Sequence, residues 1–279
     1  MSAAKPLVAT GLAALRRGGV ALLNSLVPCS GYAVQRDFAF GADPRHRLDL
    51  YVPEGLTRPA PMLLFFYGGG WQGGNRATYR AFGQAFASAG IVTAVADYRL
   101  YPAVTYPAFV EDAAAALAFL QACASDHGGD PRRIFVSGHS AGAYNAVMLA
   151  SEPKFLQARG GSLDWIRGVI GIAGPYDFLP MEEEAYVAMF HGRNNLDSMP
   201  VNHVDGPRPP MLLITGDRDR TVHPRNTISM AAKLRSLGSP VTEIHYRGIG
   251  HVRVILSLLP GFRWMSPLRR DMLNFIHSR

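Results

Sequence analysis

The chain has 279 residues, of which 48% are apolar, and its formal net charge is +7 at pH 7. A chain of this length and apolar content can bury a large core, which excludes a disordered protein. Its lysines and arginines are scattered rather than gathered into a basic stripe with interleaved aromatic residues, so we expect no nucleic-acid partner. Cys29 and Cys123 give no disulfide framework and no cluster has the spacing of metal ligands, so we expect free thiols, no metal and no cofactor.

The N-terminal segment is partly apolar but is interrupted by charge. Two arginines and two glycines occupy positions 16–19, and the apolar stretch 20–27 that follows is too short and too polar to span a bilayer. It also lacks the clean apolar run and the small residues of a signal peptide. We interpret residues 1–35 as a helical extension of a cytoplasmic protein, either a lid over the functional site or a segment packed elsewhere. Export or peripheral membrane attachment through this segment is the alternative.

From about residue 60 onward, apolar strands alternate with helical stretches. Residues 63–66 and 91–96 have the continuous apolar character of buried strands, and residues 107–124 place apolar side chains on one helical face. This alternation predicts an α/β fold with a mostly parallel sheet and helices on both faces. No linker divides the chain, so we expect residues 1–279 to form a single domain.

A glycine loop follows the first of these strands and has the sequence Tyr67-Gly68-Gly69-Gly70-Trp71. Consecutive glycines let the backbone approach a ligand closely and aim N–H groups inward. Positions 68, 70 and 73 also match the glycine fingerprint of dinucleotide-binding folds, and Asp97 falls where a ribose-binding acid is expected. However, Trp71 would crowd a pyrophosphate, and residues 75–78 delay the helix whose N-terminus would bind it. A dinucleotide-binding oxidoreductase is therefore a remote alternative.

The sequence Gly138-His139-Ser140-Ala141-Gly142 follows an apolar run at 133–137 and precedes a helical stretch at 144–150. This is the G-x-S-x-G pattern in a strand–turn–helix setting, which is typical of a nucleophilic serine on a sharp turn. Such a turn leaves no space for side chains at the two glycines. We therefore predict that Ser140 is a nucleophile, and that Ala141 begins the helix with a free N–H group.

A serine nucleophile needs a base, and the base needs an acid that orients it. Residues 211–215 and 241–246 have the pattern of strands, and a helical stretch at 224–237 separates them. Asp219 lies just after the first of these strands, and His251 lies just after the second. The order serine, aspartate, histidine is the one expected of an α/β-hydrolase.

Neighbouring residues compete for the roles of acid and base. Asp217 lies closer to the strand end than Asp219, but it is expected to bind the backbone of its own loop. The spacing Gly-x-x-Asp-x-x-Val favours Asp219. His245 lies within a strand and His223 is a loop histidine beside the acid. We therefore predict His251, which is preceded by glycine and follows the last strand, as the base.

Acyl transfer through a serine also needs donors for the negatively charged oxygen of its tetrahedral intermediate. We assign this role to three backbone N–H groups, those of Gly69, Gly70 and Ala141. Four nearby side chains are expected to line a substrate pocket: Tyr67, Trp71, Tyr176 and His139.

These motifs resemble those of the α/β-hydrolase superfamily, and within it the esterases with an HGGG or HGGxW motif. The similar segments lie between Leu48 and the C-terminal helix and are Tyr67 to Trp71, Asp97-Tyr98-Arg99-Leu100, Gly138 to Gly142, Gly174-Pro175-Tyr176-Asp177, the Asp219 loop and His251. The chain is most similar to bacterial carboxylesterases, to feruloyl or acetylxylan esterases and to kynurenine formamidases. One position departs from the family, because Tyr67 replaces the usual histidine that braces the glycine loop.

The resemblance implies a serine carboxylesterase that hydrolyses short-chain acyl esters of small molecules through an acyl-enzyme, without a stable membrane span. An arylformamidase or a peptidase on the same scaffold is the main alternative. A non-catalytic protein that uses the cleft to bind a ligand is a remote one. Residues 178–208 are predicted to form a cap insertion, whose methionine and aromatic side chains either pack or line an acyl pocket.

Overall fold

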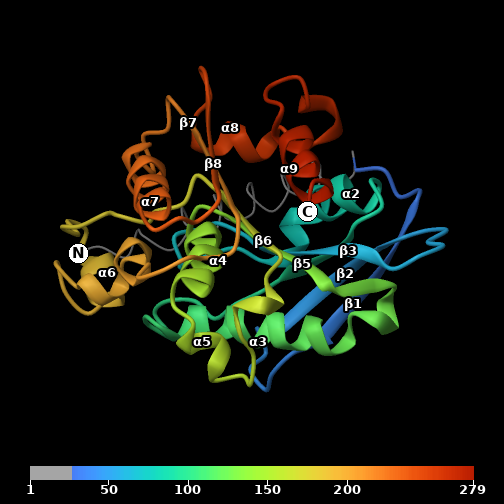
Figure 1. Cartoon of the computed structure of the whole chain (residues 1–279), viewed down its shortest axis with the longest axis horizontal. Helices are drawn as coiled ribbons and strands as arrows, with labels where there is room; N and C mark the ends of the chain where they lie inside the picture. Colours follow the sequence, from blue (N-terminus) through green and yellow to red (C-terminus); the bar gives the residue numbers. More distant parts are fainter. Residues whose placement is uncertain (1–26) are drawn as a thin grey trace, which may run out of the picture.

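The computed structural model describes residues 27–279, and its centre is an eight-stranded sheet with the order β1-β2-β4-β3-β5-β6-β7-β8 (Figure 1). The strands are β1 (Tyr32–Ala39), β2 (Arg47–Pro53), β3 (Ala60–Phe66), β4 (Val92–Ala96), β5 (Gly129–His139), β6 (Gly168–Ile172), β7 (Met211–Gly216) and β8 (Val241–Tyr246). β2 pairs antiparallel with β1 and β4, and the remaining pairs are parallel. The predicted mostly parallel α/β sheet is thereby confirmed.

Helices cover both faces of this sheet. They are α2 (Arg80–Ala87), α3 (Ala108–Cys123), α4 (Ala141–Ser151), α5 (Lys154–Gln157), α6 (Glu184–Met189), α7 (Arg225–Ser236), α8 (His251–Leu256) and α9 (Leu268–His277). Helices α2 and α9 contact each other on one face, and α3 and α4 pack together on the other (Figure 1). Every residue of β3, β4, β6 and β7 is buried. This two-sided burial explains why these strands read as continuous apolar runs rather than as alternating patterns.

The N-terminal prediction is tested only in part. Most of the predicted helical extension, and the lid that it was expected to form, lie in residues 1–26, outside the described residues. Within the rest of the range 1–35, residues 32–35 are strand rather than helix, because they pair with β2 at the edge of the sheet. Cys29 and Cys123 are both free thiols.

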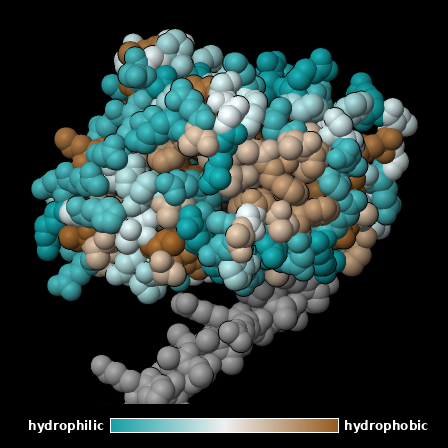
Figure 2. All heavy atoms as spheres, turned by 90° about the horizontal axis from the view of Figure 1, so that it is seen from below, coloured by the Kyte–Doolittle hydropathy of each residue, from teal (hydrophilic) through white to brown (hydrophobic). Residues whose placement is uncertain are grey.

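The surface of the described residues is mostly hydrophilic when the molecule is seen from below, and hydrophilic residues surround an apolar area there (Figure 2). Within residues 27–279, no helix is both long enough and apolar enough to cross a membrane.

Candidate active site

Ser140 lies at the sharp turn between β5 and α4, in a strained backbone conformation with a positive φ of 55° and a ψ of −123°. The turn leaves no room for neighbouring side chains. A Cβ atom on Gly138 would lie 2.1 Å from the carbonyl oxygen of Gly142, and one on Gly142 would lie 2.1 Å from that of Phe66. The N–H of Ser140 donates to the carbonyl oxygen of Ile172 at 2.9 Å, which ties the turn to β6. The predicted strand–turn–helix setting is therefore present.

Three side chains from separate loops form a hydrogen-bonded chain that ends at Ser140. His251, the first residue of α8, has its Nε2 atom 2.9 Å from Ser140 Oγ and its Nδ1 atom 2.7 Å from Asp219 Oδ2. The other carboxylate oxygen of Asp219 accepts the N–H groups of Thr221 and Val222, each at 2.9 Å. Asp219 is only 3% exposed, so these contacts fix the carboxylate and, through it, the imidazole ring. The structure thus brings the predicted nucleophile, acid and base together.

The competing acid and histidines make other contacts. Asp217 Oδ1 accepts the N–H of Gly248 at 2.7 Å, which joins the loop after β7 to the loop after β8. His245 lies 2.7 Å from a carboxylate oxygen of Glu243 within β8. His223 accepts a backbone N–H from Arg225 at its Nδ1 atom. Among the described residues, none of these three side chains makes a hydrogen bond to Ser140 or to His251.

The glycine loop between β3 and the 3₁₀ turn at Arg76–Tyr79 faces the serine. Gly69 and Gly70 have φ values of 142° and 60°, which favour glycine. Within residues 27–279, the N–H groups of Gly69, Gly70 and Ala141 have no hydrogen-bond acceptor, so they are available to a ligand. The indole Nε1 of Trp71 donates to Asn145 Oδ1 at 3.0 Å, which ties this loop to α4.

Of the four side chains predicted to line the pocket, only Trp71 does so. Tyr67 is fully buried beneath the glycine loop, where its ring stacks on those of Tyr79 and Tyr98. Tyr176 is fully buried as well, and its ring packs against the backbone of β6 and the residues after it. His139 is buried behind the serine turn. The prediction is wrong for these three residues because tight loops face the cavity with their backbone and small residues, and turn large side chains into the core.

His139 packs against His251. Its Nε2–H donates to the carbonyl oxygen of His251 at 3.1 Å, and the two rings lie 4.9 Å apart. Burial, reinforced by the positive charge of a protonated His251, lowers the pKa of His139 to about 3. The His139 ring is therefore neutral near pH 7 and serves as a fixed donor rather than as a proton carrier.

Removing His139 should change how stability depends on pH. The unfolded chain protonates this histidine near its ordinary pKa of about 6.5, whereas the folded protein keeps it neutral down to about pH 3. Between these values the unfolded state binds the additional proton, so His139 destabilises the fold as the pH falls. We expect the free energy of unfolding to fall less for His139→Gln than for the wild type as the pH is lowered from about 7 to about 4. Urea denaturation at each pH measures it. His277 is exposed, so His277→Gln should show the same dependence on pH as the wild type. If the free energy of unfolding of His139→Gln also followed that dependence, the lowered pKa of His139 would be contradicted.

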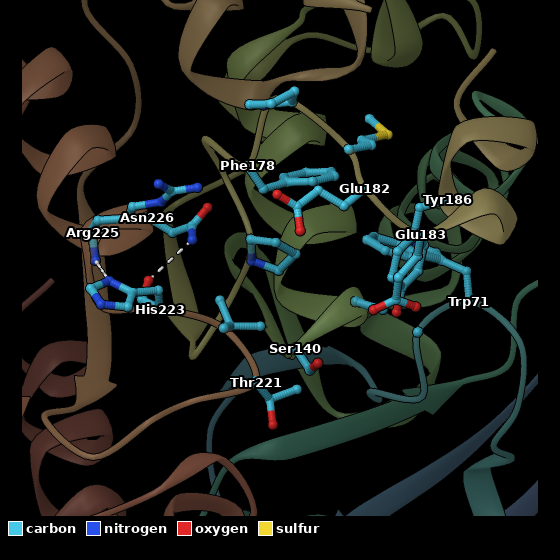
Figure 3. Close-up of a pocket in the computed structure, with 16 residues that line it drawn as sticks. Trp71, Ser140, Phe178, Glu182, Glu183, Tyr186, Thr221, His223, Arg225 and Asn226 are labelled. Atoms are coloured by element: carbon cyan, nitrogen blue, oxygen red, sulfur yellow. Dashed lines mark hydrogen bonds between the residues drawn. The ribbon is translucent and has the colours of Figure 1, made fainter. Parts of the chain in front are cut away.

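A cavity of about 470 Å³ opens above Ser140. Its lining consists of Gly70, Trp71, Ser140, Ala141, Pro175, Phe178, Pro180, Met181, Glu182, Glu183, Tyr186, Thr221, Val222, His223, Arg225 and Asn226. In Figure 3, His223 and Arg225 lie on one side of Ser140, and Glu183 and Tyr186 lie on the other. The cavity therefore has a basic side chain, Arg225, on one wall and an acidic one, Glu183, on the other.

Part of the predicted cap, residues 178–208, forms one wall of this cavity through Phe178 and the residues that lead into α6. The opposite wall includes Arg225 and Asn226, which the sequence analysis missed. Asn226 Oδ1 accepts the N–H groups of Tyr176 and Asp177, at 2.9 and 2.8 Å, and so fixes the base of the cap. Arg225 and Asn226 begin α7, directly after the Asp219 loop, and this position in the sequence could have identified them as cavity residues.

Among the described residues, no group of three histidine, cysteine or carboxylate side chains is placed to hold a metal ion.

Comparison with known proteins identifies relatives across most of the chain. Residues 48–234 match the BD-FAE family. The probable isoprenylcysteine alpha-carbonyl methylesterase ICMEL1 of Arabidopsis thaliana is 30% identical, over 80% of this chain and 52% of its own length. Esterase LipC of Mycobacterium tuberculosis is also 30% identical, over 79% of this chain and 60% of its own length. The chain thus spans between half and two thirds of the length of these two curated relatives.

Solved structures share the fold. The truncated form of a carbohydrate esterase from gut microbiota superposes with a TM-score of 0.78 at 19% identity, covering 90% of this chain and 98% of that one. Esterase Est2 of Thermogutta terrifontis gives a TM-score of 0.72 at 23% identity, over 88% of this chain and 93% of that one. At such identities the structures establish the fold alone. The match over residues 48–234 shows that the chain belongs to the BD-FAE family, and its fold is that of the α/β-hydrolases.

Proposed function

We propose that this protein is a serine carboxylic ester hydrolase that works through an acyl-enzyme. The observation that carries the proposal is the hydrogen-bonded chain from Asp219 through His251 to Ser140, which ends in an open cavity. The names of its relatives, a methylesterase and an esterase, support the same reaction class.

The geometry gives each group a role in the acylation step. His251 Nε2 takes the proton of Ser140 Oγ as this oxygen attacks the ester carbonyl carbon. The carbonyl oxygen becomes negatively charged and moves among the N–H groups of Gly69, Gly70 and Ala141. His251 then gives its proton to the departing alcohol oxygen, and the acyl group remains on Ser140.

Deacylation repeats these steps with water as the nucleophile. His251 Nε2 removes a proton from the water as it attacks the acyl carbonyl carbon, and later returns this proton to Ser140 Oγ. Asp219 keeps the proton of the imidazole on Nδ1 through the 2.7 Å contact, so that Nε2 stays free to accept. The charge of the carboxylate also stabilises the imidazolium that forms in both halves of the reaction.

The size of the cavity supports a preference for short acyl chains. Its volume of about 470 Å³ is toward the small end of the range of roughly 300–1,000 Å³ that ligand pockets occupy. Trp71 and Tyr186 meet edge to face, with ring centroids 6.2 Å apart, and narrow the cavity on one side. We therefore propose that the acyl group has roughly two to eight carbons.

A substrate series tests both the reaction class and the chain length. We expect kcat/KM for p-nitrophenyl esters to be highest between about two and eight acyl carbons and to fall for longer chains, because the acyl chain shares one cavity with the leaving alcohol. Formamide and peptide substrates with the same acyl groups serve as the comparison. Best activity at about twelve carbons or more would contradict the short-chain proposal. Faster turnover of an aryl formamide or of a peptide would reject the ester class in favour of that alternative.

A further inference from the structure

One guanidinium group holds both ends of the glycine loop, residues 67–74. Arg45 lies in the connection between β1 and β2, far from this loop in the sequence. Its Nη2 atom donates to the hydroxyl oxygen of Tyr67 at 2.5 Å and to the carbonyl oxygen of Gly74 at 3.0 Å. Its Nε atom donates to the carbonyl oxygen of Tyr98 at 2.7 Å, just after β4. The first and last residues of the loop are thus joined through one side chain.

The phenol of Tyr67 fills the space beneath the loop. A Cβ atom on Gly74 would lie 2.6 Å from the Tyr67 ring, so the loop closes directly over the ring. The Tyr67 hydroxyl donates to Asp97 Oδ1 at 2.8 Å, and the Tyr98 hydroxyl donates to the carbonyl oxygen of Tyr67, also at 2.8 Å. Asp97 in turn accepts the N–H of Arg76 at 2.8 Å, just beyond the loop. Arg45, Tyr67 and Asp97 therefore form one continuous hydrogen-bonded brace.

The turn that carries Arg45 is itself anchored. Asp43 Oδ1 accepts the N–H of Arg45 at 2.8 Å. The next residue, His46, has its Nε2 atom 2.9 Å from Asp112 Oδ1 on α3. The Arg45 side chain is one-third exposed; Tyr67 and Tyr98, to which it donates, are fully buried, whereas Gly74 is exposed. Arg45 also lies outside residues 48–234, so the brace reaches beyond the part of the chain that matches the family.

We propose that Arg45 is a positioning residue that sets the N–H groups of Gly69 and Gly70 for the negative oxygen of the tetrahedral intermediate. This inference rests on the proposed ester hydrolysis. A glycine-rich loop has many accessible conformations, and restraint at both of its ends removes most of them before the substrate arrives. Donors to a developing negative charge stabilise it most when they need no reorganisation during the reaction. Tyr67 stands where the resemblance to the HGGG esterases implies a bracing histidine, and in this chain Arg45 and Tyr67 together brace the loop.

Arg45→Met tests the proposal, with Arg47→Met as the matched control. Within the described residues, the Arg47 guanidinium donates only to the carbonyl oxygen of His46, so the control removes an equal charge two positions away. We expect Arg45→Met to lower kcat by about 10- to 100-fold with KM nearly unchanged, because the interaction acts on the transition state. Arg45→Lys should be intermediate, since an ammonium can reach one of the three acceptors but cannot span them. Active-site titration with a fluorophosphonate corrects each kcat for the folded fraction.

Two further measurements separate positioning from simple stabilisation. The affinity for a boronic acid, which forms a tetrahedral adduct on the serine, should fall in proportion to kcat in Arg45→Met. Amide hydrogen exchange of the peptide that covers residues 67–74 should be faster in Arg45→Met, and unchanged in Arg47→Met.

The outcomes are distinguishable. If Arg45→Met keeps the kcat and the loop exchange of Arg47→Met, the inference is overturned while the proposed function stands. A fall in kcat that the folded fraction explains entirely would also overturn it. If the wild type hydrolyses no ester, the proposed function fails, and hydrogen exchange alone then decides whether Arg45 restrains the loop.

Discussion

Replacing Ser140 by alanine should lower kcat for ester hydrolysis by about 10⁶-fold, because the substitution removes the attacking oxygen from a group that acts as a unit with His251. The fold should survive, since alanine removes one oxygen atom and keeps the backbone at φ 55° no more strained than serine does. The measurements are single-turnover and steady-state kinetics with a p-nitrophenyl ester, and a thermal melt for the folded state.

Ser151→Ala is the matched control for this substitution. Ser151 is fully buried at the other end of the same helix, α4, and its hydroxyl donates to the carbonyl oxygen of Val147 at 2.8 Å. It should retain nearly normal kcat. A fluorophosphonate should label Ser140 in the wild type and in Ser151→Ala, and leave Ser140→Ala unlabelled, as read by peptide mass spectrometry. A Ser140→Ala protein that turns over ester within about tenfold of the wild type would rule out Ser140 as the nucleophile.

The geometry around Ser140 could be predicted because local sequence rules determine it. Ser140 and Asp219 each follow a strand with a strong apolar pattern, and His251 follows one that alternates. Parallel strands bring their carboxyl ends to one edge of the sheet. The two glycines beside Ser140 marked the turn, because no other residue fits there. Such signals lie within a few residues of the site that they identify.

The orientation of side chains near the site could not be predicted in the same way. Tyr67, His139 and Tyr176 neighbour the cavity in sequence but are buried, because the tight loops beside them face the cavity with their backbone and small residues. β1 and the start of β2 were missed because β1 lies at the edge of the sheet, is largely exposed and has three consecutive polar residues at 35–37.

Contacts between segments that are distant in the chain could not be predicted from the sequence either. Asp97 resembled a ribose-binding acid, yet it accepts hydrogen bonds from Tyr67 and Arg76. Its role depends on the pairing of β4 with β3, which brings the ends of the two strands together. No local pattern specifies that Arg45, in a turn before β2, reaches the same cluster.

Replacing Asp219 by asparagine should lower kcat by about 10⁴-fold and leave KM nearly unchanged. The carboxylate of Asp219 is fully covered and accepts a hydrogen bond from the Nδ1–H group of His251 at 2.7 Å. An asparagine amide keeps Oδ1 for the N–H groups of Thr221 and Val222, so the loop should hold its shape. Its NH₂ group, however, donates to Nδ1 and shifts the imidazole proton to Nε2, where it blocks removal of the serine proton.

Asp217→Asn separates this effect from any change in the same loop. Asp217 Oδ1 accepts the N–H of Gly248, and an asparagine carbonyl oxygen preserves that bond. We therefore expect Asp217→Asn to keep kcat within about threefold of the wild type, in steady-state assays of the same ester with both variants. If Asp217→Asn loses activity while Asp219→Asn remains near normal, the orienting acid is Asp217. The hydrogen bond between Asp219 and His251 would then hold the histidine loop in place without controlling which nitrogen carries the proton.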